Sequence, residues 1–81
     1  MIDKTVIDSA DSFDSNLQIC YEILLYLSSR LARLQPGAVM EFISGDLEAG
    51  EKVASWCEMR GFTLLESGLA SDGRLRFLIQ K

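Results

Sequence analysis

An apolar stripe at helical spacing, ended by a helix-stopping sequence, constrains the fold of this chain most strongly. The members of the stripe follow one another at intervals of three or four residues, as one face of a helix requires: Leu17, Cys20, Leu24, Leu27, Leu31 and Leu34. Pro36-Gly37 cannot continue a helix, because proline lacks the backbone N–H and glycine readily takes the left-handed conformation. The pattern predicts a long helix over residues 16–34.

Short runs rich in apolar and β-branched residues flank this helix and predict strands. Lys4–Asp8 is the first run, and Ser9–Ser15 after it has the Ser- and Asp-rich composition of a loop. Val39–Ser44 follows the helix and is apolar enough to be a central strand. Phe62–Glu66 and Leu75–Gln80 are the third and fourth predicted strands, and turn residues separate them.

A second helix is predicted between the second and third strands. Asp46 is a suitable N-cap for it, and Gly61 is a suitable residue to end it in the left-handed conformation. Between them, apolar residues fall at roughly helical spacing: Leu47, Val53, Trp56 and Cys57. Trp56 and Cys57 are therefore expected to pack in the core, where a tryptophan buries a large apolar area.

The predicted order of elements is β-α-β-α-β-β. The simplest packing of that order is an α+β fold, a two-layer sandwich with two helices packed on one face of a four-stranded mixed sheet. A chain of 81 residues is expected to form one domain over residues 1–81.

The charge and hydropathy of the chain argue against several classes of function. A net charge of −4 and a pI of about 4.6 argue against a nucleic-acid binder, which needs a basic face for the phosphates. RNA binding is supported only by analogy, because translation-factor domains have a similar β-α-β-α-β-β layout. No apolar run approaches the ~20 residues of a membrane span. Because no secretory signal begins the chain, a cytoplasmic location is expected.

Two cysteines and no histidine limit the chemistry that is open to the chain. Ser-His and Cys-His nucleophilic catalysis within the chain are excluded, and two thiols cannot complete a structural zinc site. A disulfide between Cys20 and Cys57 is possible by count, but it is disfavoured in a cytosolic protein. Asp11 and Asp14 could bind a metal ion, although hydration of a Ser/Asp loop is the simpler interpretation.

Cys20 is the candidate reactive residue, and two interpretations of it remain open. Near the N-terminus of a helix, the unpaired N–H groups would stabilise a thiolate and make the cysteine reactive. If Asp14 or Ser15 caps the helix earlier, Cys20 lies a turn or more inside it and shares its stripe with apolar residues. Free cysteine is among the most buried residue types, so Cys20 would then be inert.

The chain resembles the TusA/SirA-like sulfurtransferase family of small sulfur-carrier proteins. With Cys20 placed on the family's sulfur-carrying cysteine, five later segments of the chain align without a gap: Pro36-Gly37, Gly45-Asp46-Leu47, Val53-Ala54-Ser55-Trp56-Cys57, Gly61-Phe62-Thr63-Leu64-Leu65 and Phe77-Leu78-Ile79-Gln80-Lys81. They fall on the turn after the first helix, an Asp-Asp-Pro turn, an Ile-Pro-x-aromatic-Cys segment, a Gly-His-x-Leu-Leu segment and the last strand. The main departure is at the site, where Cys20-Tyr21-Glu22-Ile23 replaces Cys-Pro-x-Pro and lacks both prolines.

The resemblance implies a carrier that accepts a persulfide sulfur on Cys20 and relays it to a partner protein, without a cofactor or a metal. It implies a sulfur donor, such as a cysteine desulfurase or a rhodanese, and a sulfur acceptor as partners. The missing prolines keep a second interpretation open, a non-catalytic interaction or regulatory domain on the same fold. Arg30 and Arg33 could form a docking patch for an acidic partner, although a solvated helix end is the simpler interpretation.

Overall fold

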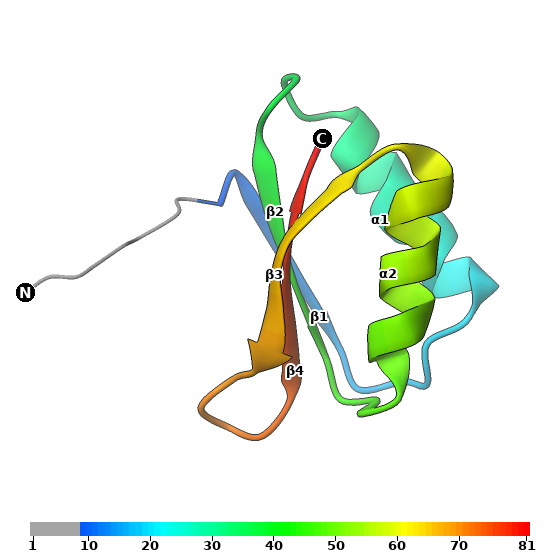
Figure 1. Cartoon of the computed structure of the whole chain (residues 1–81), viewed down its shortest axis with the longest axis vertical. Coiled ribbons are helices and arrows are strands. Elements are labelled where there is room, and N and C mark those ends of the chain that lie inside the picture. The colour runs from blue at the N-terminus through cyan, green and yellow to red at the C-terminus, as the bar shows by residue number, and fades with distance from the viewer. Residues whose placement is uncertain (1–8) are drawn as a thin grey trace, which may run out of the picture.

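Two helices pack on one face of a mixed four-stranded sheet in the computed structural model, which describes residues 9–81 (Figure 1). The elements in chain order are β1 Asp11–Ser15, α1 Tyr21–Ala32, β2 Val39–Ser44, α2 Ala49–Arg60, β3 Thr63–Leu69 and β4 Leu75–Gln80. The strands lie in the order β1-β2-β4-β3, with β1 parallel to β2 and the other neighbours antiparallel. The predicted α+β class and the β-α-β-α-β-β order are confirmed.

The first strand of the sheet is not where the sequence predicts it. The predicted strand Lys4–Asp8 lies outside the described residues, and the predicted loop over Ser9–Ser15 is wrong because Asp11–Ser15 forms β1. Parallel pairing with β2 holds these residues extended despite their low strand propensity. The one aromatic residue of the segment, Phe13, stacks on Phe42 of β2 with ring centroids 5.7 Å apart.

An ion pair between β1 and α1 also fixes this edge of the sheet. The Arg30 guanidinium donates to both Asp11 carboxylate oxygens, at 2.8 and 2.6 Å, and its central carbon lies 5.5 and 5.4 Å from the ring centroids of Phe13 and Tyr26. The hydrogen bond from Arg30 is the main reason that the pKa of Asp11 is held below its usual value. Arg30 therefore stabilises the fold. Because its charge is paired with Asp11, only Arg33 of the predicted docking patch at Arg30 and Arg33 could offer its charge to a partner.

α1 begins later than predicted, and its buried stripe matches the predicted one only in part, at Leu27 and Leu31. It spans Tyr21–Ala32 rather than residues 16–34, and its buried residues are Ile23, Leu27 and Leu31. Leu17, at the start of the predicted stripe, precedes the helix and is 69% exposed. At the other end, Lys81 Nζ donates to the carbonyl oxygens of Ala32 and Leu34, at 2.8 and 2.7 Å. The carbonyl of Ala32 is one of those that a helix end leaves unpaired.

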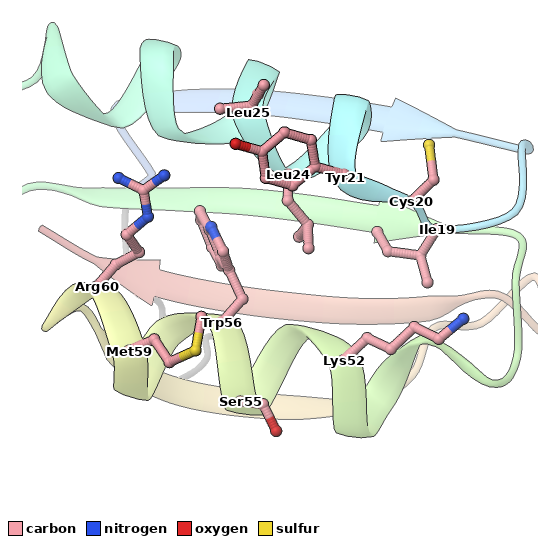
Figure 2. A pocket seen from close by; sticks show the side chains of 10 residues that line it. All are labelled: Ile19, Cys20, Tyr21, Leu24, Leu25, Lys52, Ser55, Trp56, Met59 and Arg60. Carbon is pink, nitrogen blue, oxygen red and sulfur yellow. The ribbon is translucent and has the colours of Figure 1, made fainter.

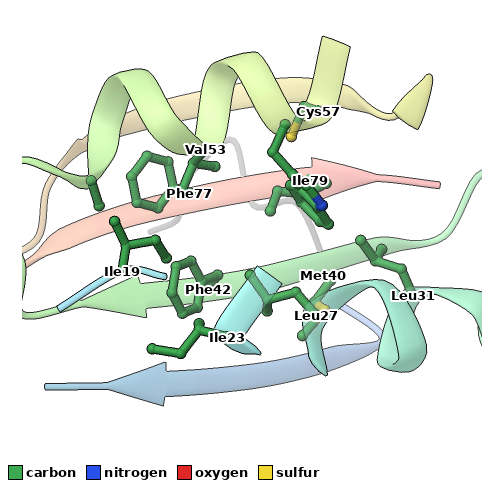
Figure 3. Packing of buried hydrophobic residues seen from close by; sticks show 12 residues of the cluster. Ile19, Ile23, Leu27, Leu31, Met40, Phe42, Val53, Cys57, Phe77 and Ile79 are labelled. Atoms are coloured by element: carbon green, nitrogen blue, oxygen red, sulfur yellow. The ribbon is translucent and has the colours of Figure 1, made fainter. Parts of the chain in front are cut away.

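The core fills the space between the two helices and the sheet (Figure 3). Alternate residues of the two central strands point toward the helices, as a period of two requires. The buried apolar cluster consists of Ile19, Ile23, Leu27, Leu31, Met40, Phe42, Ala49, Val53, Trp56, Cys57, Phe77 and Ile79. The predicted core positions Trp56 and Cys57 are confirmed, at 5% and 2% exposure.

The second half of the chain follows the sequence prediction closely. β2 and β4 have the predicted bounds, and Gly61 ends α2 with a φ of +78°, in the left-handed region that favours glycine. β3 begins one residue later than predicted and runs on to Leu69. Pairing with β4, with an irregularity between Leu64 and Glu66, extends it through residues whose composition suggests a turn.

Candidate functional site

Cys20 is the N-cap residue of α1 and is exposed to solvent. Its backbone is extended, with φ −153° and ψ 174°, and its carbonyl oxygen accepts the Leu24 N–H at 3.1 Å, which is the first bond of the helix. The N–H groups of the first helical turn have no acceptor within a helix and form its positive end. Of the two interpretations of Cys20, the structure therefore contradicts the one that places it buried inside the helix.

Asp46 ties the residue before Cys20 to the turn before α2. Its two carboxylate oxygens accept the backbone N–H groups of Ile19 and Glu48, each at 2.9 Å. These two hydrogen bonds, that from Ile19 first, hold the pKa of Asp46 below its usual value. The N-cap of α2 is Glu48, so the prediction that Asp46 caps this helix is wrong. Asp46 instead fixes the segment that presents Cys20.

The loop before Cys20 is held at two further points. Ile19 is 2% exposed and anchors it in the core. At its start, the Gly45 N–H donates to the Ser15 carbonyl oxygen at 2.8 Å, and a Cβ on Gly45 would lie 2.8 Å from Oδ1 of Asn16. Such a Cβ would also lie 3.1 Å from the Asn16 Cα, so the close approach of this loop favours glycine at residue 45. The backbone on the N-terminal side of Cys20 is well fixed although its thiol is free.

Replacing Asp46 should loosen this segment. Asp46→Ala removes the acceptor of the Ile19 N–H, so we expect amide hydrogen exchange at Ile19 to accelerate by about tenfold or more, as measured by NMR at neutral pH. In the wild type, the protection of the Ile19 N–H relative to an unstructured amide should fall in this way only in acid. A carboxylate with a lowered pKa keeps its bonds above the usual value of 3.8 and loses them as the pH falls through the folded pKa.

Glu48→Ala is the matched control for this substitution. It removes a carboxylate from the same turn without removing the acceptor of the Ile19 N–H, because the Glu48 side chain makes no capping bond to the helix within residues 9–81. Exchange at Ile19 should stay within about twofold of the wild type. Equal acceleration in both variants would mean that local charge, rather than the hydrogen bond, controls the exchange.

The two residues at the positions of the family's prolines serve other purposes here. Tyr21 and Ile23 occupy the first and third positions of α1, where a backbone N–H has no acceptor within the helix. The backbone would therefore accept proline at either position. Tyr21 instead carries an aromatic ring that is 71% exposed, and Ile23 joins the core at 9% exposure. The missing prolines change the side chains around Cys20 and leave the start of the helix in place.

A groove between α1 and α2 begins at Cys20 (Figure 2). Its volume is about 440 Å³, within the range of ligand-binding clefts. The lining side chains come from both helices and from the residue before Cys20: Ile19, Cys20, Tyr21, Leu24, Leu25, Lys52, Ser55, Trp56, Met59 and Arg60. Sequence reasoning missed this groove, although its α2 residues recur at the three- and four-residue spacing of one helix face.

The second cysteine lies in a different environment. Cys57 is buried in the core, and burial raises the pKa of its thiol to about 11. Both cysteines are free thiols. A buried neutral thiol is chemically inert, whereas an exposed thiol at a helix N-terminus matches the environment of reactive cysteines. The two cysteines are therefore not equivalent candidates for chemistry.

The remaining sequence candidates lie apart from Cys20. Asp11 is bound to Arg30, and Asp14 lies 3.4 Å from a guanidinium nitrogen of Arg74. Within residues 9–81, no three cysteine or acidic side chains come close enough to hold a metal ion together. Over the same residues, neither helix has the length and apolar character needed to cross a bilayer.

Comparison with known proteins identifies the family. The family model described as "Sulfurtransferase TusA" matches residues 14–81, which include Cys20, both helices and three of the four strands. A search of the curated proteins finds no match. The match covers well over half of the chain and confirms the resemblance inferred from the spacing of its motifs. The chain belongs to the TusA sulfurtransferase family, whose general role is that of a sulfur carrier that works with sulfur donor and acceptor proteins.

Proposed function

We propose that this protein carries sulfur as a persulfide on Cys20, acting as a single domain in the cytoplasm, where thiols stay reduced. The observation that carries the proposal is the exposed thiol of Cys20 at the N-cap of α1, in a chain of the TusA family. The donor is a persulfide-bearing protein such as a cysteine desulfurase or a rhodanese, and the acceptor is a second partner protein.

The transfer step balances without any other reactant. The Cys20 thiolate attacks the outer sulfur of the donor persulfide, a new S–S bond forms at Cys20, and the donor's S–S bond breaks to leave the donor thiolate. In the second transfer, an acceptor thiolate attacks the outer sulfur on Cys20. The S–S bond at Cys20 breaks, and the free cysteine is restored. No net oxidation occurs, because the sulfur moves in the oxidation state in which it arrived.

Mass spectrometry tests this proposal directly. After incubation with a cysteine desulfurase and cysteine, or with inorganic polysulfide, we expect an added mass of about 32 Da, one sulfur atom, on the peptide that contains Cys20. Cys20→Ser should remove the adduct, and Cys57→Ala should retain it, because Cys57 is buried. Polysulfide needs no protein recognition, so absence of the adduct with both donors would contradict the proposal.

A second function, a non-catalytic interaction domain on the same fold, is favoured by one observation. Tyr21 and Ile23 occupy the positions at which the family has prolines, and the Ile23 side chain is buried in the core. Such a domain would bind its partner with equal affinity when Cys20 is replaced by serine. A sulfur carrier would lose transfer in the same variant, so the two functions separate in one experiment.

A further inference from the structure

The groove between α1 and α2 differs in charge from the rest of the molecule. The chain has twelve acidic and eight basic residues, yet both charged side chains that line the groove, Lys52 and Arg60, are basic. Glu51 and Glu58 of the same helix do not line it. Lys52 and Arg60 form no ion pair with a carboxylate among residues 9–81, and Lys52 exerts only a minor electrostatic effect on Asp46. This cationic site on an acidic protein would attract an acidic ligand.

The centre of the groove is apolar. Trp56 forms part of its floor at 5% exposure, and around it Tyr21, Leu25 and Met59 are 71%, 42% and 80% exposed. Large apolar side chains that gather around a groove mark a binding surface more often than scattered ones do. Tyrosine, tryptophan and methionine are also enriched at protein interfaces, where methionine adapts its shape to the partner.

The two cations lie at opposite ends of this apolar centre. Figure 2 shows Lys52 at the end where Cys20 lies and Arg60 at the far end, with Trp56 and Leu24 between them. Eight residues separate the two cations along α2, which corresponds to about 12 Å at the helical rise of 1.5 Å per residue. Two carboxylates seven or eight residues apart on a partner helix would match that spacing, and a groove between two helices accommodates the side-chain ridge of a third.

We propose that this groove binds an acidic amphipathic helix of the protein that exchanges sulfur with Cys20. Its apolar side chains lie over Trp56, and its two carboxylates meet Lys52 and Arg60. That the partner exchanges sulfur rests on the proposed function, whereas the docking itself rests on the groove. Because Cys20 lines one end, a docked partner holds its own sulfur near the thiol, which raises the effective concentration of the reacting groups.

A synthetic peptide tests the docking. The probe is a capped 14-residue helical peptide with leucines along one face and a glutamate at each end of that face, about 12 Å apart. Trp56 is the only tryptophan of the chain and lines the groove, so its fluorescence should change as the peptide binds. Lys52→Glu with Arg60→Glu should weaken binding on the order of tenfold, and a peptide with lysines in place of the glutamates should bind that double variant better than the wild type.

Arg33→Glu is the matched control. Arg33 and Arg60 are both exposed and both lie at the C-terminal end of a helix, so replacing either by glutamate changes the net charge equally and places a carboxylate at a helix end. Arg33→Glu should leave peptide binding within about twofold of the wild type, and Arg60→Glu alone should weaken it more. Equal losses in these two variants, equal binding of the two peptides, or no change in Trp56 fluorescence would overturn the docking proposal.

Polysulfide loading separates this inference from the proposed function. Lys52→Glu with Arg60→Glu should load Cys20 from inorganic polysulfide at a rate within about threefold of the wild type, because a small donor needs no groove. Peptide binding without any loading of wild-type Cys20 would support the docking groove and overturn the sulfur-carrier function. Normal loading without peptide binding would overturn the groove alone.

Discussion

Iodoacetamide should alkylate Cys20 in the native protein at least about a hundred times faster than Cys57 at pH 8. Cys20 lies in solvent at the N-cap of α1, whereas Cys57 is 2% exposed in the core. The pKa of Cys57 is raised to about 11, so only about one Cys57 thiol in a thousand is a thiolate at pH 8. Iodoacetamide can also reach the Cys57 thiol only when the core opens locally.

The measurement is the rate of carbamidomethylation of each cysteine-containing peptide, followed by mass spectrometry. Between pH 8 and pH 10, the rate at Cys57 should rise about tenfold per pH unit while the fold is intact, because the reactive thiolate fraction is still far from complete. Denaturation in urea should bring the two rates close together. Equal rates in the native protein would contradict the burial of Cys57, and a slow Cys20 would contradict its exposure.

Truncating Phe42 should remove a large part of the free energy of unfolding of the protein. Phe42 is fully buried in β2 and stacks between Phe13 and Phe77, with ring centroids 5.7 and 5.8 Å away. Phe42→Ala leaves a cavity between the sheet and the helices and costs about 3–5 kcal/mol. The whole stability of a domain of this size is about 4–12 kcal/mol. We therefore expect the urea concentration at the midpoint of unfolding, followed by circular dichroism, to fall markedly.

Leu69→Ala is the control for this substitution. Leu69 is a large apolar residue at the end of β3, 71% exposed, so its truncation should change the free energy of unfolding by no more than about 0.5 kcal/mol. If Phe42→Ala were as stable as Leu69→Ala, the stacked aromatic residues would not form the centre of the core. The m-value distinguishes a loss of stability from a change in the unfolded state.

Much of this fold could be predicted from the sequence, because the signals that define it are local. β2 and β4 carry enough apolar and alternating residues to be recognised alone, and Gly61 ends α2 by its own conformational freedom. The family was recognisable for the same reason, since its turns and its Trp56-Cys57 pair are short segments at fixed spacing.

The parts that were mispredicted depend on contacts between distant residues. β1 is a strand because it pairs with β2 and because Arg30, nineteen residues on, binds Asp11. α1 begins after Cys20 because Asp46, twenty-seven residues away, holds the Ile19 N–H outside the helix. Propensity favours an earlier start, and tertiary hydrogen bonding overrides it. The groove likewise forms only where α1 and α2 lie side by side, so the sequence of either segment alone does not predict it.

The free side chain of Cys20 has a consequence for how partners distinguish the two states of a carrier. Most N-cap residues hold the helix through a side-chain hydrogen bond, but the Cys20 thiol makes none within residues 9–81. Lengthening it by a sulfur atom would therefore break no bond of α1. Under the proposed function, empty and loaded molecules would therefore keep the same hydrogen bonds at the start of α1, and no rearrangement of this helix end would signal the bound sulfur. A partner would have to recognise a loaded molecule through direct contact with the terminal sulfur.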